Sequence, residues 1–155
     1  MSELPAEVER FLAGRRFAVA GVSRQPKEAA NAIYRKLAAA GYEVVPVNPK
    51  ATEVEGVPCF ADLDSVPGEL DGVVVATPPA AAAEVVHQAV ARGVRNLWFH
   101  RSFGDGSVSQ PAVAAAKEAG LDCVVGGCPL MFVSPVDPVH RCMRWWLGRK
   151  GRVPR

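Results

Sequence analysis

Residues 17–47 have the sequence FAVAGVSRQPKEAANAIYRKLAAAGYEVVPV, in which two short apolar runs flank a helical pattern. The first run, Phe17–Val22, and the second, Glu43–Val47, each predict a buried strand. Between them, from about Glu28 to Ala40, small and apolar residues recur at helical spacing, and Gly41 is suited to end the helix. This strand–helix–strand order predicts two parallel strands joined by a right-handed crossover.

The rest of the chain repeats this alternation. Further apolar runs at Gly72–Thr77, Asn96–Phe99 and Asp122–Val125 predict three more strands. Most of the five runs are continuous rather than alternating, which is typical of strands covered on both faces. We expect helices between them, together with a leading helix and a short helical turn, at 79–92, 111–119, 3–13 and 61–66. The predicted fold is α/β and Rossmann-like: a doubly wound, mainly parallel sheet of five or six strands in a single domain, 1–155.

The C-terminal segment differs in kind. Asp137 and Pro138 are suited to begin a helix of about 138–148, followed by a basic tail, 149–155. One apolar stripe is predicted on this helix, with Trp145 off it, from Val139, Cys142, Met143, Trp146 and Leu147. Trp145 either packs back on the sheet or belongs to a self-association surface, so a homodimer through this helix stays open.

Composition excludes several classes of protein. The 155 residues are 49% hydrophobic and 22% charged, as in soluble globular domains, and no apolar run reaches the roughly 20 residues of a membrane span. No secretory signal precedes the domain, so the cytoplasm is the default compartment. The cations of 141–155 predict a solvated tail rather than a nucleic-acid site. Four cysteines without a C-x-x-C pair predict reduced thiols and no zinc site.

In an open α/β sheet, ligands bind beyond the carboxyl ends of the strands, so the residues that follow each strand are informative. After the first strand, Gly21 permits close approach of the backbone, and Ser23 can donate to a phosphate. Arg24 and Lys27 add positive charge just ahead of a helix N-terminus, which itself attracts anions. These residues predict a phosphate site.

Two more strand ends extend this site. The second strand is followed by Asn48-Pro49-Lys50, where NAD-binding domains usually carry an acidic residue; Lys50 instead suits a phosphorylated ribose. The third ends in Thr77-Pro78-Pro79, a stiff turn that can lie against an adenine or ribose. The G-x-G-x-x-G fingerprint is absent, which argues against ordinary NAD or FAD binding. An NADP-binding reductase or a regulatory nucleotide-binding domain is the alternative, because Arg24 and Lys50 equally suit a 2′-phosphate.

The sequence resembles the small bacterial CoA-binding proteins, whose domain is similar to the N-terminal CoA-binding domain of the succinyl-CoA synthetase alpha subunit. The resemblance runs from about Arg16 to Trp146, and its most specific block is the GYEVVPVNP of 41–49. The other matches are at 21–23, 31–34, 77–79, 98 and 128–132.

The resemblance implies coenzyme A or an acyl-CoA as the ligand. Gly21, Val22 and Ser23 would lie beside its phosphates, and Thr77, Pro78 and Pro79 would flank the adenine. The ribose-phosphate end would border Val47, Asn48, Pro49 and Lys50. Many relatives have a serine where this chain has Ala30, and Asn31 is the candidate to replace that contact.

No catalytic residue is predicted. The chain carries no second domain with the phosphorylated histidine of the synthetase, so ligase activity is not transferred to it. His100 follows a strand, but a lone histidine without an orienting carboxylate is weak evidence for acid–base chemistry. Cys128, after Gly126-Gly127, is either a small residue in a tight turn or a redox-active thiol. We therefore predict a non-catalytic CoA-binding protein.

Overall fold

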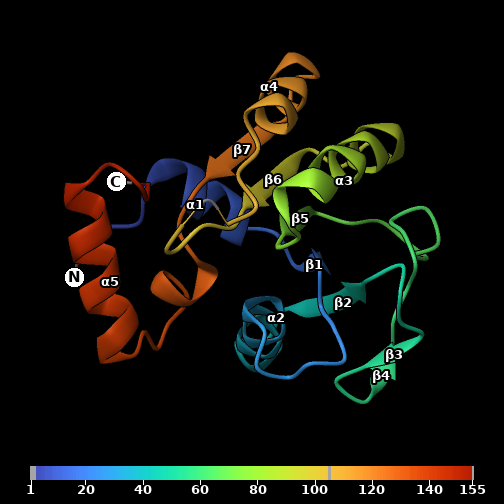
Figure 1. Cartoon of the computed structure of the whole chain (residues 1–155), viewed down its shortest axis with the longest axis horizontal. Helices are drawn as coiled ribbons and strands as arrows, with labels where there is room; N and C mark the ends of the chain where they lie inside the picture. Colours follow the sequence, from blue (N-terminus) through green and yellow to red (C-terminus); the bar gives the residue numbers. More distant parts are fainter. Residues whose placement is uncertain (1–2, 105, 155) are drawn as a thin grey trace.

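A computed structural model describes residues 3–104 and 106–154. Five parallel strands form one sheet in the order β2-β1-β5-β6-β7. Their bounds are Arg16–Ala20 (β1), Glu43–Val47 (β2), Gly72–Val75 (β5), Asn96–Phe99 (β6) and Asp122–Val125 (β7). The doubly wound α/β fold and its five predicted strands are thus confirmed (Figure 1).

Helices cover both faces of this sheet. Along the chain they are α1 (Ala6–Leu12), α2 (Ala29–Ala39), α3 (Pro79–Arg92), α4 (Gln110–Glu118), a 3-10 turn η1 (Pro129–Met131) and α5 (Pro138–Arg149). Successive residues of a strand point to opposite faces, so β1 sends Phe17 and Val19 to the core under α1 and α2. Ala18 and Ala20 of the same strand enter the core under α3 and α4. Burial on both faces explains why the strands are continuously apolar.

Two of the strands end earlier than the sequence predicts. The runs 17–22 and 72–77 were expected to be strand throughout, but β1 ends at Ala20 and β5 ends at Val75. Gly21 has a φ of 109°, a left-handed conformation that turns the chain out of the ladder. Gly21, Val22, Ala76 and Thr77 therefore lie in loops at the carboxyl edge of the sheet.

The link between β2 and β5 also differs from the prediction. Residues 61–66 form turns and bends rather than a helical turn, because the Asp62 carboxylate accepts hydrogen bonds from both the Ser65 N–H and the Ser65 hydroxyl. Ahead of it lies a short antiparallel hairpin, β3 (Glu53–Val54) and β4 (Val57–Pro58), which the sequence reading missed.

The C-terminal helix is present, but its predicted apolar stripe is wrong. Leu147 is buried, whereas Val139 and Trp146 are 66% and 42% exposed. Figure 1 shows why: α5 lies at the end of the molecule opposite the β3–β4 hairpin, and it packs on η1 at one edge rather than flat on the sheet. Only a narrow side of α5, around Leu147, therefore meets the core.

Candidate functional site

The strand order creates a crevice beside β1. From β1 the chain crosses to β2 on one side, and β5 pairs on the other side, so the direction of winding reverses between β1 and β5. In open parallel sheets this reversal separates the loops at the carboxyl edge and leaves room for a ligand. The loops after β1, β2 and β5 meet here. We call their predicted ligand-contacting residues the strand-end site: Gly21, Val22, Ser23, Arg24, Lys27, Asn48, Pro49, Lys50, Thr77, Pro78 and Pro79.

Gly21 joins all three strand ends. Its N–H donates to the Val47 carbonyl at 2.9 Å, which ties the end of β1 to the end of β2. A Cβ at this position would lie 2.4 Å from the Ala76 carbonyl oxygen and 3.2 Å from the Thr77 nitrogen. The loop after β5 therefore packs against bare backbone, and glycine is required by both this contact and the positive φ.

Asn48 fixes the second loop beside the first. Its side-chain Nδ2 donates to the Val22 carbonyl at 2.9 Å, and its Oδ1 accepts the Lys50 N–H at 2.8 Å. The Asn48 backbone N–H donates to the Phe60 carbonyl at 2.8 Å. Asn48 thus uses its amide within the protein and places Pro49 and Lys50 at the edge of the crevice, where both are exposed.

Asn31 supports residues 21–28, the loop between β1 and α2, which we call the phosphate loop after its predicted role. It is buried at 1% exposure, and its Oδ1 accepts the Ser23 N–H at 3.0 Å. Its Nδ2 donates to the Ser23 carbonyl at 2.8 Å and to Glu55 Oε1 at 2.9 Å. Because both Nδ2 hydrogens are used inside the protein, this geometry gives Asn31 a positioning role and does not support a direct contact with phosphate.

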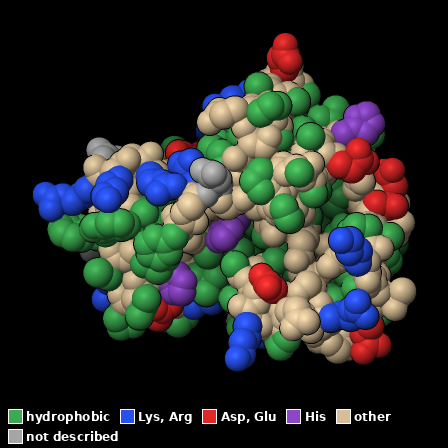
Figure 2. Space-filling view, in the orientation of Figure 1, with side chains coloured by type: hydrophobic (Ala, Val, Ile, Leu, Met, Phe, Trp, Pro, Cys, Tyr) green, Lys and Arg blue, Asp and Glu red, His purple; other side chains and the backbone are tan. Residues whose placement is uncertain are grey.

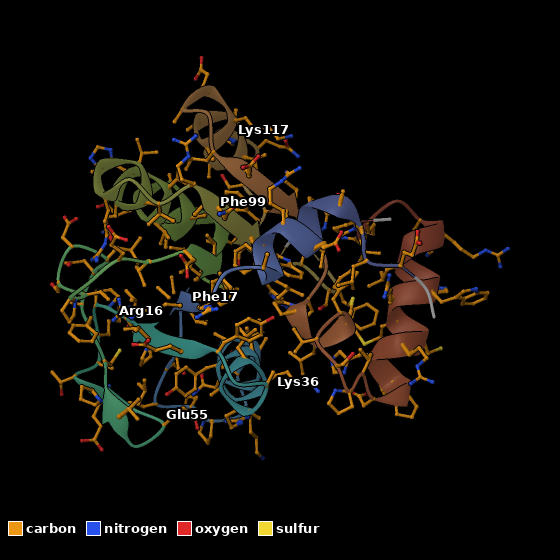
Figure 3. All side chains as sticks on the ribbon, turned by 180° about the vertical axis from the view of Figure 1, so that it is seen from behind. Arg16, Phe17, Lys36, Glu55, Phe99 and Lys117 are labelled. Atoms are coloured by element: carbon orange, nitrogen blue, oxygen red, sulfur yellow. The ribbon has the colours of Figure 1, made fainter. Side chains whose placement is uncertain are left out.

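Glu55 connects the hairpin to the same network, and the sequence reading missed it. Its carboxylate accepts from Asn31 and also from Arg35 Nη1 at 2.6 Å, while Arg35 Nη2 donates to the Pro26 carbonyl at 3.0 Å. Figure 3 shows Glu55 between the hairpin and α2. Glu55 and Gly56 both have positive φ, 51° and 73°, so a two-residue hairpin loop ending in glycine was the available signal.

A cavity of about 530 Å³ opens at this edge. It brings together Arg24, Pro49 and Lys50 with residues before, in and after the hairpin, namely Ala51, Thr52, Glu53, Cys59 and Ala61. Arg24 and Lys50 are exposed cations, while Glu53 is the acidic residue of the lining. An anionic ligand would meet these two cations in the cavity beside the β1–α2 loop.

The remaining predicted residues lie around this cavity rather than in its wall. Val22 and Val47 are buried, so their side chains are not accessible to a ligand. Lys27 is exposed on the loop that leads into α2. Pro78 and Pro79 are exposed at the start of α3, and the Thr77 carbonyl accepts the buried Ser107 hydroxyl at 2.5 Å.

Two side chains with catalytic potential lie farther along the same edge. Burial lowers the pKa of His100 from its usual 6.5 to about 4, so its imidazole is neutral near pH 7. Burial raises the pKa of the Cys128 thiol to about 12, and this residue is only 3% exposed. The thiol is protonated and shielded, which argues against the redox alternative. Ser102 Oγ lies 3.4 Å from His100 Nε2, which gives His100 a hydroxyl neighbour instead of a carboxylate.

Within residues 3–104 and 106–154, no three His, Cys, Asp or Glu side chains gather closely enough to hold a metal ion. None of the helices in this described part of the chain combines the length and the apolar character needed to cross a membrane.

Comparison with known proteins places the fold in context. Residues 15–134 match a family described as "CoA binding domain". An uncharacterized protein of Bacillus subtilis, YneT, is 27% identical over 124 residues, which cover 79% of this chain and 89% of YneT. The alpha subunit of acetate–CoA ligase (ADP-forming) II from Pyrococcus furiosus is 28% identical over 91 residues, 58% of this chain but only 20% of that subunit. The chain therefore spans about a fifth of this ligase subunit.

A solved structure agrees with these sequence relatives. A conserved hypothetical protein from Pyrococcus furiosus superposes with a TM-score of 0.67 at 32% identity, covering 75% of this chain and 97% of that one. The matched region of this chain includes the phosphate loop, the Asn48-Pro49-Lys50 turn and the end of β5.

Proposed function

The chain belongs to the family of CoA binding domains, and on that premise we propose that it binds coenzyme A or an acyl-CoA without catalysing a reaction. The ligand lies across the carboxyl ends of β1, β2 and β5, in the strand-end site. The observation that carries this proposal is that hydrogen bonds and close backbone contacts of Gly21 and Asn48 bring the ends of these three strands together. They lie beside a cavity with two exposed cations.

The parts of the ligand are assigned by charge and shape. The pyrophosphate lies against the Gly21–Ser23 backbone ahead of α2, where the dipole of the helix favours an anion. Arg24 and Lys27 supply positive charge to the same loop. Lys50 pairs with the 3′-phosphate of the ribose, and the Thr77-Pro78-Pro79 turn flanks the adenine.

The non-catalytic part of the proposal is supported by the protonation states at this edge. A general base works best when its pKa is near the working pH, and the pKa of His100 is about 4. A cysteine nucleophile needs a thiolate, and the pKa of Cys128 is about 12. Neither group is prepared for acid–base or nucleophilic chemistry near pH 7.

Thermal unfolding with CoA, 3′-dephospho-CoA, NAD and NADP, each added separately, tests the proposal. A ligand at 100 times its Kd stabilises the folded state by about 2.7 kcal/mol, which corresponds to roughly 5–10 °C in Tm for a domain of this size. We expect this shift with CoA, a smaller one with dephospho-CoA and little with NAD or NADP. A shift with NADP alone would replace the CoA assignment by the reductase alternative.

A further inference from the structure

A second and larger concave surface lies away from the strand-end site and shares no residue with it. It measures about 1310 Å³ and is formed by α5, η1, the segment between them and the first and last described parts of the chain. We call it the arginine surface, after its three lining arginines, Arg141, Arg144 and Arg149; Trp145 and Phe132 also line it. At the α5 end of the molecule, Figure 2 shows basic and apolar side chains side by side.

Among the residues that the structure describes, none offers a carboxylate partner to the three arginines. Arg141 Nη2 donates to the Val136 carbonyl and Arg144 Nη2 donates to the Glu3 carbonyl, at 3.2 and 3.3 Å. The Arg144 guanidinium also lies 4.5 Å from the centre of the Phe132 ring, and that of Arg149 lies 4.9 Å from the Trp145 ring. None of the ion pairs in residues 3–104 and 106–154 includes them.

Partial burial adds to the need for a negative charge. Arg144 is half-buried, and burial lowers its pKa from the usual value, so its charge is partly desolvated without a neutralising carboxylate. Charged groups removed from water are normally paired. An incoming carboxylate would find a guanidinium fork here that is already held in place by Phe132 and by the Glu3 carbonyl.

The apolar part of the surface fits a protein partner. Trp145 is 61% exposed at the rim, and Met131, Phe132 and Leu4 contribute to the lining. Tryptophan and arginine are the residue types that most often dominate binding energy at protein interfaces. An extended apolar lining beside positive charge calls for an apolar side chain that has carboxylates as neighbours.

We propose that the arginine surface docks an acidic segment of another protein, with carboxylates on the arginines and an apolar side chain against Trp145 and Phe132. This site is independent of CoA binding. Positive charge dominates α5 and the segment after it, because residues 138–154 contain five Arg or Lys and no Asp or Glu, and the Asp137 carboxylate at the N-cap is paired with His140. Two copies of α5 facing each other in a symmetric dimer would bring these cations together, which disfavours self-association through this face.

Single-stranded nucleic acid fits less well. Such binding uses successive aromatic platforms on which bases stack. On this surface the exposed ring is Trp145, and the Arg149 guanidinium already lies over it. The other exposed ring of α5, Trp146, does not line this surface and instead contacts Phe103 and Lys150, so the lining offers no row of stacking platforms.

The test is fluorescence anisotropy with a labelled 12-residue peptide of alternating Glu and Leu, in the absence of CoA. We expect binding that weakens with salt and at least tenfold loss of affinity in the double variant Arg144→Gln/Arg149→Gln. The matched control, Arg95→Gln/Lys117→Gln, removes two exposed cations that do not line the arginine surface and should bind like the wild type. A single charge reversal at the exposed Arg149, Arg149→Glu, keeps the test valid if the double variant unfolds.

Several results would overturn the proposal. One is equal binding of the same peptide with Gln in place of Glu, because then charge plays no part; another is no binding of the acidic peptide. Tighter, Arg149-dependent binding of an oligothymidine of 12 nucleotides would assign the surface to nucleic acid. If analytical ultracentrifugation shows a dimer of the wild type that is lost in Arg149→Glu, the surface would be assigned to a second copy of this chain. The CoA-dependent Tm shift should be unchanged in every variant, which separates this test from the proposed function.

Discussion

At Gly21 a single missing side chain decides the geometry of the strand-end site. A Cβ at this position would overlap the Ala76 carbonyl, and the φ of 109° is strained for any residue with an L side chain. Asn48 acts in the opposite way, through a side chain whose amide links two loops. The sequence indicated both positions because each follows a buried strand. It did not reveal that Asn31 and Glu55 hold the loop from behind, since contacts across 24 residues leave no local pattern.

We predict that His100 makes the free energy of unfolding depend on pH. Its folded pKa of about 4 is below its usual 6.5, so between these values the unfolded chain binds a proton that the folded protein excludes. The free energy of unfolding therefore has its full value above pH 6.5 and falls by up to about 3 kcal/mol as the pH drops toward 4. Urea unfolding between pH 4.5 and 8 should show this decline in the wild type and a flatter profile in His100→Gln. Identical profiles below pH 6.5 would show that His100 is not shielded from protonation.

At the scale of elements, α2 links the phosphate loop to the β3–β4 hairpin. Asn31, from its first turn, bonds to Ser23 on one side and to Glu55 on the other, and Arg35 adds a second bond to Glu55. The loop and the hairpin thus form the walls of the cavity as a connected unit.

Replacing Asn31 by leucine tests this connection. Asn31→Leu keeps the branched shape of the side chain but leaves the Ser23 N–H and carbonyl without their partner, and each unsatisfied buried group costs about 1–3 kcal/mol. We expect the free energy of unfolding, measured in urea, to fall by about 2 kcal/mol, and CoA to bind more weakly. The control is Glu28→Gln on the same helix, at an exposed N-cap whose side chain makes no capping bond. Wild-type stability in Asn31→Leu would contradict the supporting role.

Elements differ in how well the sequence predicts them. The five strands were predicted because burial on both faces makes them continuously apolar, and Gly41 follows α2 as the expected stop signal. The two-residue strands of the hairpin are too short for a pattern. The stripe on α5 has correct helical spacing, but spacing alone cannot tell an apolar face that meets the core from one that faces solvent.

For the whole molecule, one fold separates two surfaces of different character. The strand order β2-β1-β5-β6-β7 places the crevice beside β1, and the hairpin flanks it. The chain then passes through β6 and β7 to η1, on which α5 packs at the opposite end of the molecule (Figure 1). A nucleotide at one end and an acidic partner at the other could be held at the same time without competing for residues.

Isothermal titration of CoA and 3′-dephospho-CoA into the wild type and Lys50→Gln tests the central claim most directly, with Lys117→Gln as the control. If CoA lies in the strand-end site with its 3′-phosphate on Lys50, Lys50→Gln weakens CoA binding about tenfold, or about 1.4 kcal/mol, and leaves dephospho-CoA binding unchanged. Equal weakening of the binding of both ligands would show that Lys50 does not pair with the 3′-phosphate. Unchanged binding of both would do the same, and no binding of CoA to the wild type would contradict the account as a whole.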